Sequence, residues 1–136
     1  VPGRTSSNLI ADTTLHLANH SNIIGIKEAS GSIEQAMHIM SKKPKDFVLI
    51  SGDDLLTVSL YALGAVGVIS VLANAFGDHF KTIKEKKQTN DYLGASEELF
   101  KLLRINELMF KESNPVGIKY VLKAQGVCNA YVRLPL

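Results

Sequence analysis

The residue with the clearest potential for chemistry is Lys27, which directly follows the apolar run of residues 22–26, NIIGI. A lysine at the end of a buried strand is costly unless it has a function, because desolvation disfavours the charged ammonium. The same desolvation would favour the neutral amine, which is a nucleophile toward a carbonyl carbon. The residues alone leave a second interpretation equally open, in which Lys27 reaches solvent and pairs with Glu28 or Asp53.

Two further positions could contribute to a binding site. Gly52, within residues 51–54 (SGDD), follows the next apolar run, where a glycine lets the backbone approach a ligand closely. The same four residues are also typical of a turn in which Asp53 or Asp54 caps the following helix. Arg4, on a predicted loop, has a guanidinium suited to holding a carboxylate by two hydrogen bonds, although surface turns also contain such arginines.

The elements that would position these residues alternate between helix and strand. Apolar spacing and capping residues indicate helices over residues 6–20, 32–43 and 55–63. Short β-branched runs between turn residues indicate strands at 22–27, 47–50 and 66–71. This alternation predicts βαβ units and a parallel sheet, with Lys27 and Gly52 at the carboxyl ends of two strands and Arg4 at the same end.

Only helices are indicated after these strands, at residues 73–88, 91–111 and 115–125, the last with Pro115 at its first position. Three parallel strands are too few for a stable barrel, since both outer strands would have unpaired apolar edges, and a (β/α)8 barrel takes about 250 residues.

The sequence therefore predicts an α/β fold that is the carboxy-terminal part of a (β/α)8 barrel. Residues 1–72 would supply its strands and their helices, and residues 73–136 the last barrel helix and a helical extension. The amino-terminal half of the barrel would be missing from this chain. Because Val1 is not a methionine and begins a turn, we expect the natural amino terminus to lie upstream.

Composition argues against several other classes of protein. Hydrophobic residues make up 46% and charged residues 21% of the chain, as in globular domains, and the net charge is only +2. The densest basic run, residues 84–87 (KEKK), contains a glutamate and no aromatic residue, so we expect no nucleic-acid partner. Cys128 is alone, and no apolar run approaches a membrane span, so we expect a cytoplasmic protein without disulfides or membrane contact.

The motifs, taken in order, resemble those of the dihydrodipicolinate synthase family. The matching segments are residues 1–5 (VPGRT), 25–31 (GIKEASG), 51–54 (SGDD), 67–71 (GVISV), 73–74 (AN), 112–119 (ESNPVGIK) and 132–136 (VRLPL). They extend over the whole chain in the order that the family has. The resemblance implies a lyase of the class I aldolase type, acting in lysine and diaminopimelate biosynthesis.

The resemblance also implies roles for individual residues. Lys27 matches the lysine that forms a Schiff base with pyruvate, whose enamine then attacks L-aspartate 4-semialdehyde. Arg4 matches an arginine that helps to hold the carboxylate of the aldehyde substrate. Gly52 and Ile69 match backbone positions that line the pocket, with the Ile69 carbonyl facing the substrate. No metal or organic cofactor is implied, because the lysine adduct is itself the electron sink.

Parts of the family's site have no match in this sequence. Its proton-shuttling tyrosines and threonine, its pyruvate-carboxylate loop and its lysine-feedback site belong to the half of the barrel that is absent here. None of the four tyrosines matches the shuttle; these are Tyr61, Tyr92, Tyr120 and Tyr131. A homo-oligomer, dimer or tetramer, is implied, with Ile33 and Leu63 at apolar contacts between subunits.

Two alternative functions remain open at the level of sequence. N-acetylneuraminate lyases and keto-sugar-acid aldolases share the lysine strand, but they usually lack the Pro-Gly-Arg-Thr turn and a glutamate at the position of Glu28. A half-barrel that only assembles with a partner, without catalysis, is the third hypothesis.

Overall fold

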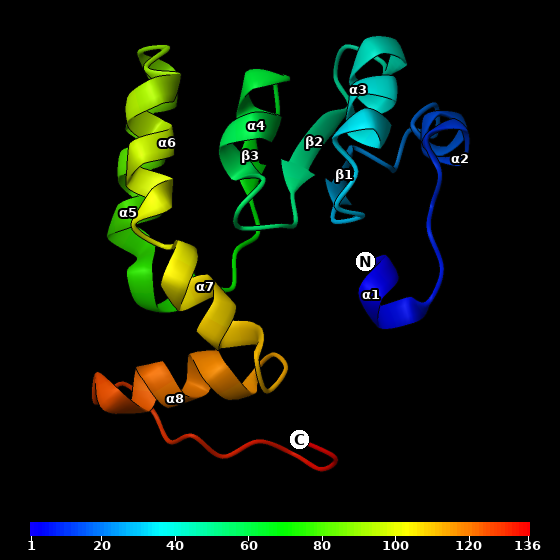
Figure 1. Cartoon of the computed structure of the whole chain (residues 1–136). Helices are drawn as coiled ribbons and strands as arrows, with labels where there is room; N and C mark the ends of the chain where they lie inside the picture. The colour runs from blue at the N-terminus through cyan, green and yellow to red at the C-terminus, as the bar shows by residue number, and fades with distance from the viewer. The chain divides into compact units, whose positions relative to one another are not determined.

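A parallel three-stranded sheet organises the first part of the computed structural model, which describes residues 1–136 (Figure 1). The strands are β1 (Gly25–Glu28), β2 (Val48–Ser51) and β3 (Gly67–Val68), in the order β1-β2-β3. Lys27 lies beside Ile50, and Ile50 lies beside Gly67 on the next strand. The predicted βαβ arrangement is thereby confirmed.

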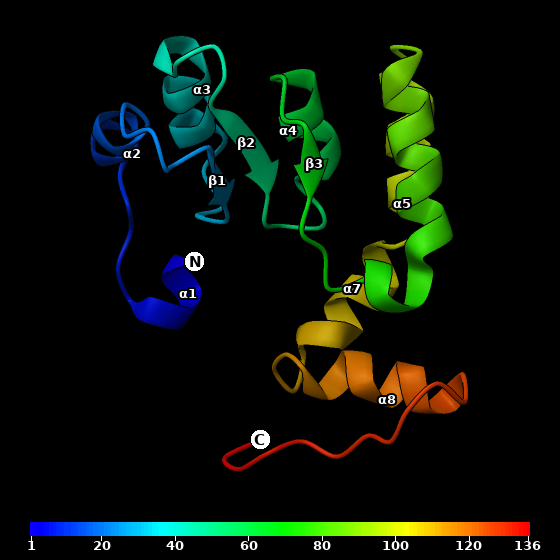
Figure 2. The ribbon, with the colours of Figure 1, turned by 180° about the vertical axis from the view of Figure 1, so that it is seen from behind.

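Helices cover one face of this sheet. Helix α3 (Ile33–Lys42) connects β1 to β2, α4 (Thr57–Ala62) connects β2 to β3, and both lie on the same face (Figures 1 and 2). Residues of a strand alternate between the two faces, and Leu49 and Ser51, on the covered face, are 1% and 0% exposed. Val48 and Ile50 face the other way and are only half-buried.

The segment before β1 differs from the prediction of a single helix over residues 6–20. It contains two short helices, α1 (Pro2–Thr5) and α2 (Ala11–Leu17), separated by five residues. Asn8 does not cap α2, because its side-chain amide donates to Oε1 of Gln35 at 2.8 Å instead, and Ile10 occupies the N-cap position. This long-range contact replaces the local capping that the sequence suggested.

The structure divides into two compact units, Val1–Ile69 and Ser70–Leu136. The second unit is helical: α5 (Ala73–Gln88), α6 (Tyr92–Phe100), α7 (Leu103–Phe110) and α8 (Val116–Ala124). Helices α5 and α6 pack along each other, and Nδ1 of His79 lies 2.6 Å from Oε1 of Glu98 between them.

Two helix predictions for this unit need correction. The helix predicted over residues 91–111 is in fact α6 and α7, because the chain turns at Lys101 and Leu102, where Leu102 becomes buried at 2% exposure. Pro115 is the N-cap of α8 rather than its first residue. Gly117 lets α8 approach α7 closely, since a β-carbon there would lie 2.5 Å from the carbonyl oxygen of Met109. None of the helices has the length and apolar character needed to cross a membrane.

Candidate active site at the carboxyl ends of the strands

Lys27 is the third residue of β1 and is paired with Ile50, so it lies on the face of the sheet opposite to the buried residues Leu49 and Ser51. The expectation that this lysine is buried is wrong for the chain as it stands, because Lys27 is exposed. The reason lies in the sheet: no element of the first unit covers the face toward which Lys27 points. Its pairing with Glu28 is also excluded geometrically, since consecutive residues of a strand point to opposite faces.

Gly52 lies directly after β2 and adjoins the lysine. Its backbone N–H donates to the carbonyl of Glu28 at 2.7 Å, which continues the β1–β2 ladder by one residue. A β-carbon built at Gly52 would lie 2.9 Å from Cγ of Lys27 and 2.7 Å from Cβ of Ala29. Only glycine at this position leaves space for the aliphatic stem of the lysine in this conformation.

The aspartates after Gly52 form the turn into α4. Oδ1 of Asp53 accepts hydrogen bonds from the backbone N–H groups of Leu55 at 2.9 Å and Leu56 at 3.1 Å. The hydroxyl of Ser51 donates to the carbonyl of Asp53 at 2.7 Å and tightens the same turn. Of the two aspartates that the sequence offered as caps, Asp53 therefore serves this turn directly, and it shares no ion pair with Lys27.

Ile69 follows β3 at the same edge of the sheet. Its N–H donates to the carbonyl of Ser51 at 2.8 Å, and the residue is 52% exposed. The sheet thus brings Lys27, Gly52 and Ile69 to the carboxyl ends of three adjacent parallel strands, where α/β proteins bind their ligands.

Arg4 belongs to α1, which lies beyond the carboxyl ends of β1 and β2 in both views (Figures 1 and 2). The residue was predicted on a loop, and it instead occupies a helix of four residues, with its side chain exposed. The structure therefore confirms the predicted end of the sheet for Arg4 but not its local conformation.

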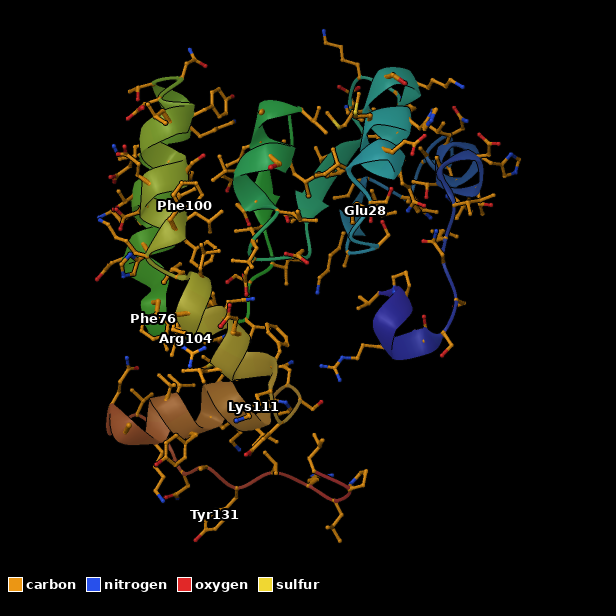
Figure 3. The ribbon with its side chains drawn as sticks, in the orientation of Figure 1. Glu28, Phe76, Phe100, Arg104, Lys111 and Tyr131 are labelled. Atoms are coloured by element: carbon orange, nitrogen blue, oxygen red, sulfur yellow. The ribbon has the colours of Figure 1, made fainter.

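Sequence reasoning missed a polar network on the covered face. The carboxylate of Glu28, 5% exposed at the end of β1 next to the start of α3, accepts the N–H of Ser30 at 2.6 Å (Figure 3). It also accepts Nε2 of Gln35 at 2.9 Å. A signal for Gln35 was present, because Ser32 and Gln35 have the S-x-x-Q spacing of a capping box.

Comparison with known proteins agrees with this architecture. The model of the dihydrodipicolinate synthetase family matches residues 1–136, the whole chain. The chain belongs to this family. The 4-hydroxy-tetrahydrodipicolinate synthase of Cytophaga hutchinsonii is 45% identical to it over 136 residues, which are 100% of this chain and 46% of that protein.

Solved structures of the family give the same result. Dihydrodipicolinate synthase from Aquifex aeolicus superposes with a TM-score of 0.94 at 33% identity and is covered over 47% of its chain. The chloride-inhibited dihydrodipicolinate synthase from Acinetobacter baumannii, solved in complex with pyruvate, superposes with a TM-score of 0.93 at 34% identity, also over 47%. In each case 100% of the present chain is covered.

The chain spans less than half the length of the dihydrodipicolinate synthases that it matches. Its three parallel strands with their helices are a partial (β/α)8 barrel followed by carboxy-terminal helices, as predicted. The strands β1 and β3 are the two edges of this partial barrel.

The only tyrosine of the first unit is not on the face of the sheet that carries Lys27. Tyr61, 4% exposed on α4, has its pKa raised by burial, and α4 lies on the covered face of the sheet. The other three tyrosines belong to the second unit: Tyr92, Tyr120 and Tyr131. None of the four is assigned a catalytic role.

Proposed function

We propose that this chain supplies the Schiff-base lysine of a 4-hydroxy-tetrahydrodipicolinate synthase, which condenses pyruvate with L-aspartate 4-semialdehyde. The observation that carries the proposal is the position of Lys27. Its amine extends from the open face at the carboxyl end of β1, above a glycine that leaves space for its stem. The pyruvate bound by the related enzyme of Acinetobacter baumannii supports the choice of the first substrate.

In the proposed reaction the neutral amine of Lys27 attacks the keto carbon of pyruvate. The carbinolamine loses water to form an imine, and loss of a proton from the methyl group gives an enamine. The enamine carbon then bonds to the aldehyde carbon of the semialdehyde, and the amino group of that substrate closes the ring as Lys27 is released. Lysine suits this chemistry because its amine can be both nucleophile and leaving group.

The other residues at this edge would bind rather than react. The guanidinium of Arg4 would hold the carboxylate of the semialdehyde, since α1 lies beyond the strand ends that carry Lys27. Gly52 and Ile69 would line the pocket with backbone groups. Proton transfer between the adduct and solvent would be performed by side chains contributed by the rest of the barrel.

The partners in this proposal are the amino-terminal half of the barrel and further subunits. The outer edges of β1 and β3 are free for the neighbouring strands of a closed barrel. We expect a homo-oligomer in which Ile33 and Leu63, both half-buried here, contact a second subunit.

The test uses a completed barrel, defined as the Cytophaga hutchinsonii synthase in which this chain replaces the matching 136 residues. Borohydride reduction in the presence of pyruvate should leave a stable adduct on the peptide that contains Lys27. Mass spectrometry of a proteolytic digest locates the adduct. Lys27→Arg should abolish it while the fold is retained, because arginine keeps the charge but has no nucleophilic amine.

The outcome also separates the proposal from its alternatives. An adduct on Lys119 or Lys123 would contradict the assignment of Lys27. Turnover with N-acetylneuraminate or a keto-sugar acid, in place of the semialdehyde, would show a sibling aldolase. A completed barrel that forms no adduct with pyruvate would indicate a half-barrel that only assembles.

A further inference from the structure

The buried carboxylate of Glu28 determines how the side-chain amide of Gln35 is oriented. A carboxylate only accepts hydrogen bonds, so the group 2.9 Å from Oε2 of Glu28 must be the NH2 of the glutamine. The carbonyl oxygen, Oε1, then turns the other way, toward Asn8. Glu28 is itself fixed by the N–H of Ser30 at 2.6 Å.

Gln35 is held firmly at the start of α3. Its backbone N–H donates to the hydroxyl of Ser32, the N-cap residue, at 3.0 Å. In a capping box the side chain at this position returns to the N-cap residue. Here it contacts Glu28 and the segment between α1 and α2 instead, so the end of β1 is linked to residues far away in sequence.

The link reaches Asn8 and Leu9. Nδ2 of Asn8 donates to Oε1 of Gln35 at 2.8 Å, and Nε2 of Gln35 lies 3.3 Å from both Oδ1 of Asn8 and the carbonyl of Leu9. These contacts span 26 and 27 residues of sequence, whereas the hydrogen bonds between Thr5 and Ser7 join residues only two apart. Asn8 is thus a point at which the amino-terminal segment is attached to α3, and through Gln35 and Glu28 to the end of β1.

Arg4 lies four residues before this point of attachment, on a helix of four residues with no buried residue. So short a helix has too few internal hydrogen bonds to be stable alone. The position of Arg4 beyond the strand ends therefore depends in part on what holds the residues that follow it.

We infer that Glu28, Gln35 and Asn8 are positioning residues that hold α1, and with it Arg4, at a set place relative to Lys27. Glu28 lies next to Lys27 at the end of β1 and orients Gln35, and Gln35 in turn forms hydrogen bonds with Asn8. The inference rests on the proposed function, in which Arg4 binds the carboxylate of the aldehyde substrate. None of the three positioning residues touches substrate in this scheme.

A double-mutant cycle in the completed barrel tests this inference. Gln35→Leu removes all the side-chain hydrogen bonds of Gln35 at similar volume, and should raise KM for the semialdehyde about tenfold with little change in kcat or in the rate of pyruvate adduct formation. Asn8→Ala should act in the same direction. In an Arg4→Ala background, Gln35→Leu should have no further effect on KM, because its action passes through Arg4.

The matched control is Gln125→Leu. Gln125 donates one side-chain hydrogen bond, to the carbonyl of Ala75 at 3.3 Å, and both residues belong to the second unit. This variant should leave KM for the semialdehyde unchanged. A general loss of stability caused by replacing a glutamine would appear in both variants, whereas loss of the attachment appears only in Gln35→Leu.

Amide hydrogen exchange provides a measure that does not depend on turnover. Residues 1–9 should exchange faster in Gln35→Leu and Asn8→Ala, and at the parent rate in Gln125→Leu. Unchanged exchange there, or additive effects of Gln35→Leu and Arg4→Ala on KM, would overturn the positioning role. If the two effects on KM are additive while the parent enzyme still turns over the semialdehyde, the positioning role is wrong and the proposed function stands. A parent that forms no pyruvate adduct would overturn both.

Discussion

The stem of Lys27 occupies the space in which any residue other than glycine at position 52 would place its β-carbon. That β-carbon would lie 2.7 Å from Cε of Lys27, which is the atom next to the amine. This distance is too short for two non-bonded carbon atoms, so a β-carbon at position 52 would force one of the two atoms to shift. The choice of residue after β2 therefore affects the position of the nucleophile at the end of β1.

Gly52→Ala should accordingly slow the reaction of Lys27 with pyruvate. The new methyl group displaces the stem of the lysine, and misplacement of a reacting atom by about 1 Å costs roughly a hundredfold in rate. We therefore expect the borohydride-trapped adduct to form roughly ten- to hundredfold more slowly, with the fold retained. The adduct is measured by mass spectrometry over time in the completed barrel.

Gly77→Ala is the control for this substitution, because a β-carbon at Gly77 has no atom within 4 Å. It should form the adduct at the parent rate. If Gly52→Ala formed the adduct equally fast, the lysine stem could adopt another conformation without loss of rate, and the proposed steric role of Gly52 would be wrong.

Arg4→Ala should weaken use of the semialdehyde more than it weakens reaction with pyruvate. A hydrogen bond to a charged group contributes about 1.5–3 kcal/mol, so the ratio kcat/KM for the semialdehyde should fall roughly ten- to hundredfold. The trapped pyruvate adduct should form at the parent rate, because Arg4 is proposed to bind the other substrate. Steady-state kinetics with each substrate varied in turn gives both values.

A matched arginine lies on α7. Arg104 is exposed and pairs with Glu107 at 2.8 Å, so Arg104→Ala removes a surface ion pair that contributes little. Kinetics equal to the parent are expected for it. Equal kinetics for Arg4→Ala as well would mean that Arg4 has only the surface role that the sequence also allowed.

The sheet could be predicted from sequence because its signals are local. Residues 47–50 are a β-branched and apolar run between turn residues, and the bounds of β2 agree with this run to within one residue at each end. Since the carboxyl ends of parallel strands meet at one edge, the common location of Lys27 and Gly52 could be predicted from the alternation of strands and helices, whereas Ile69 was included only through the family resemblance.

The features that the sequence did not predict depend on contacts between distant residues. The break between α6 and α7 has no proline or glycine, and it is the burial of Leu102 that accompanies the turn. Gln35 was overlooked because its partner Asn8 is 27 residues away. The burial expected for Lys27 depends on other residues packing against a face of the sheet that the first unit leaves uncovered.

Glu98 predicts a pH dependence of stability. The hydrogen bond from Lys101, followed by that with His79, holds the pKa of Glu98 below its ordinary value, against the opposing effect of burial. A carboxyl group with a lowered pKa in the folded state stabilises the fold above its unfolded pKa, and this contribution is lost as the pH falls through the folded pKa.

Glu98→Gln should therefore destabilise the completed barrel at neutral pH, by an amount on the order of 1 kcal/mol or less, and the difference should disappear once the pH falls below the lowered pKa of Glu98 in the folded state. Urea unfolding at a series of pH values measures it. Glu107→Gln, which removes the carboxylate of the exposed pair on α7, is the control and should have a smaller effect. A difference for Glu98→Gln that persisted at low pH would show that packing, not charge, is responsible.

The 136-residue chain by itself should self-associate and lack synthase turnover. Its edge strands β1 and β3 are flanked by exposed apolar residues, Ile24 at 76% and Val66 at 54%, and unpaired apolar edges pair readily with other chains. Light scattering should therefore give a mass well above the 14.8 kDa of the monomer.

Replacing both Ile24 and Val66 by lysine should reduce the association, because charge on an edge strand opposes pairing. Leu134→Lys, in the exposed carboxy-terminal segment, should not reduce it. Turnover should be absent because none of the four tyrosines matches the proton shuttle of the family, and a positioned proton-transfer group contributes about a hundred- to ten-thousandfold in rate. Addition of the amino-terminal half of the Cytophaga hutchinsonii synthase should lower the mass of the aggregates and restore turnover. A stable 14.8 kDa monomer with turnover near that of the completed barrel would contradict the prediction.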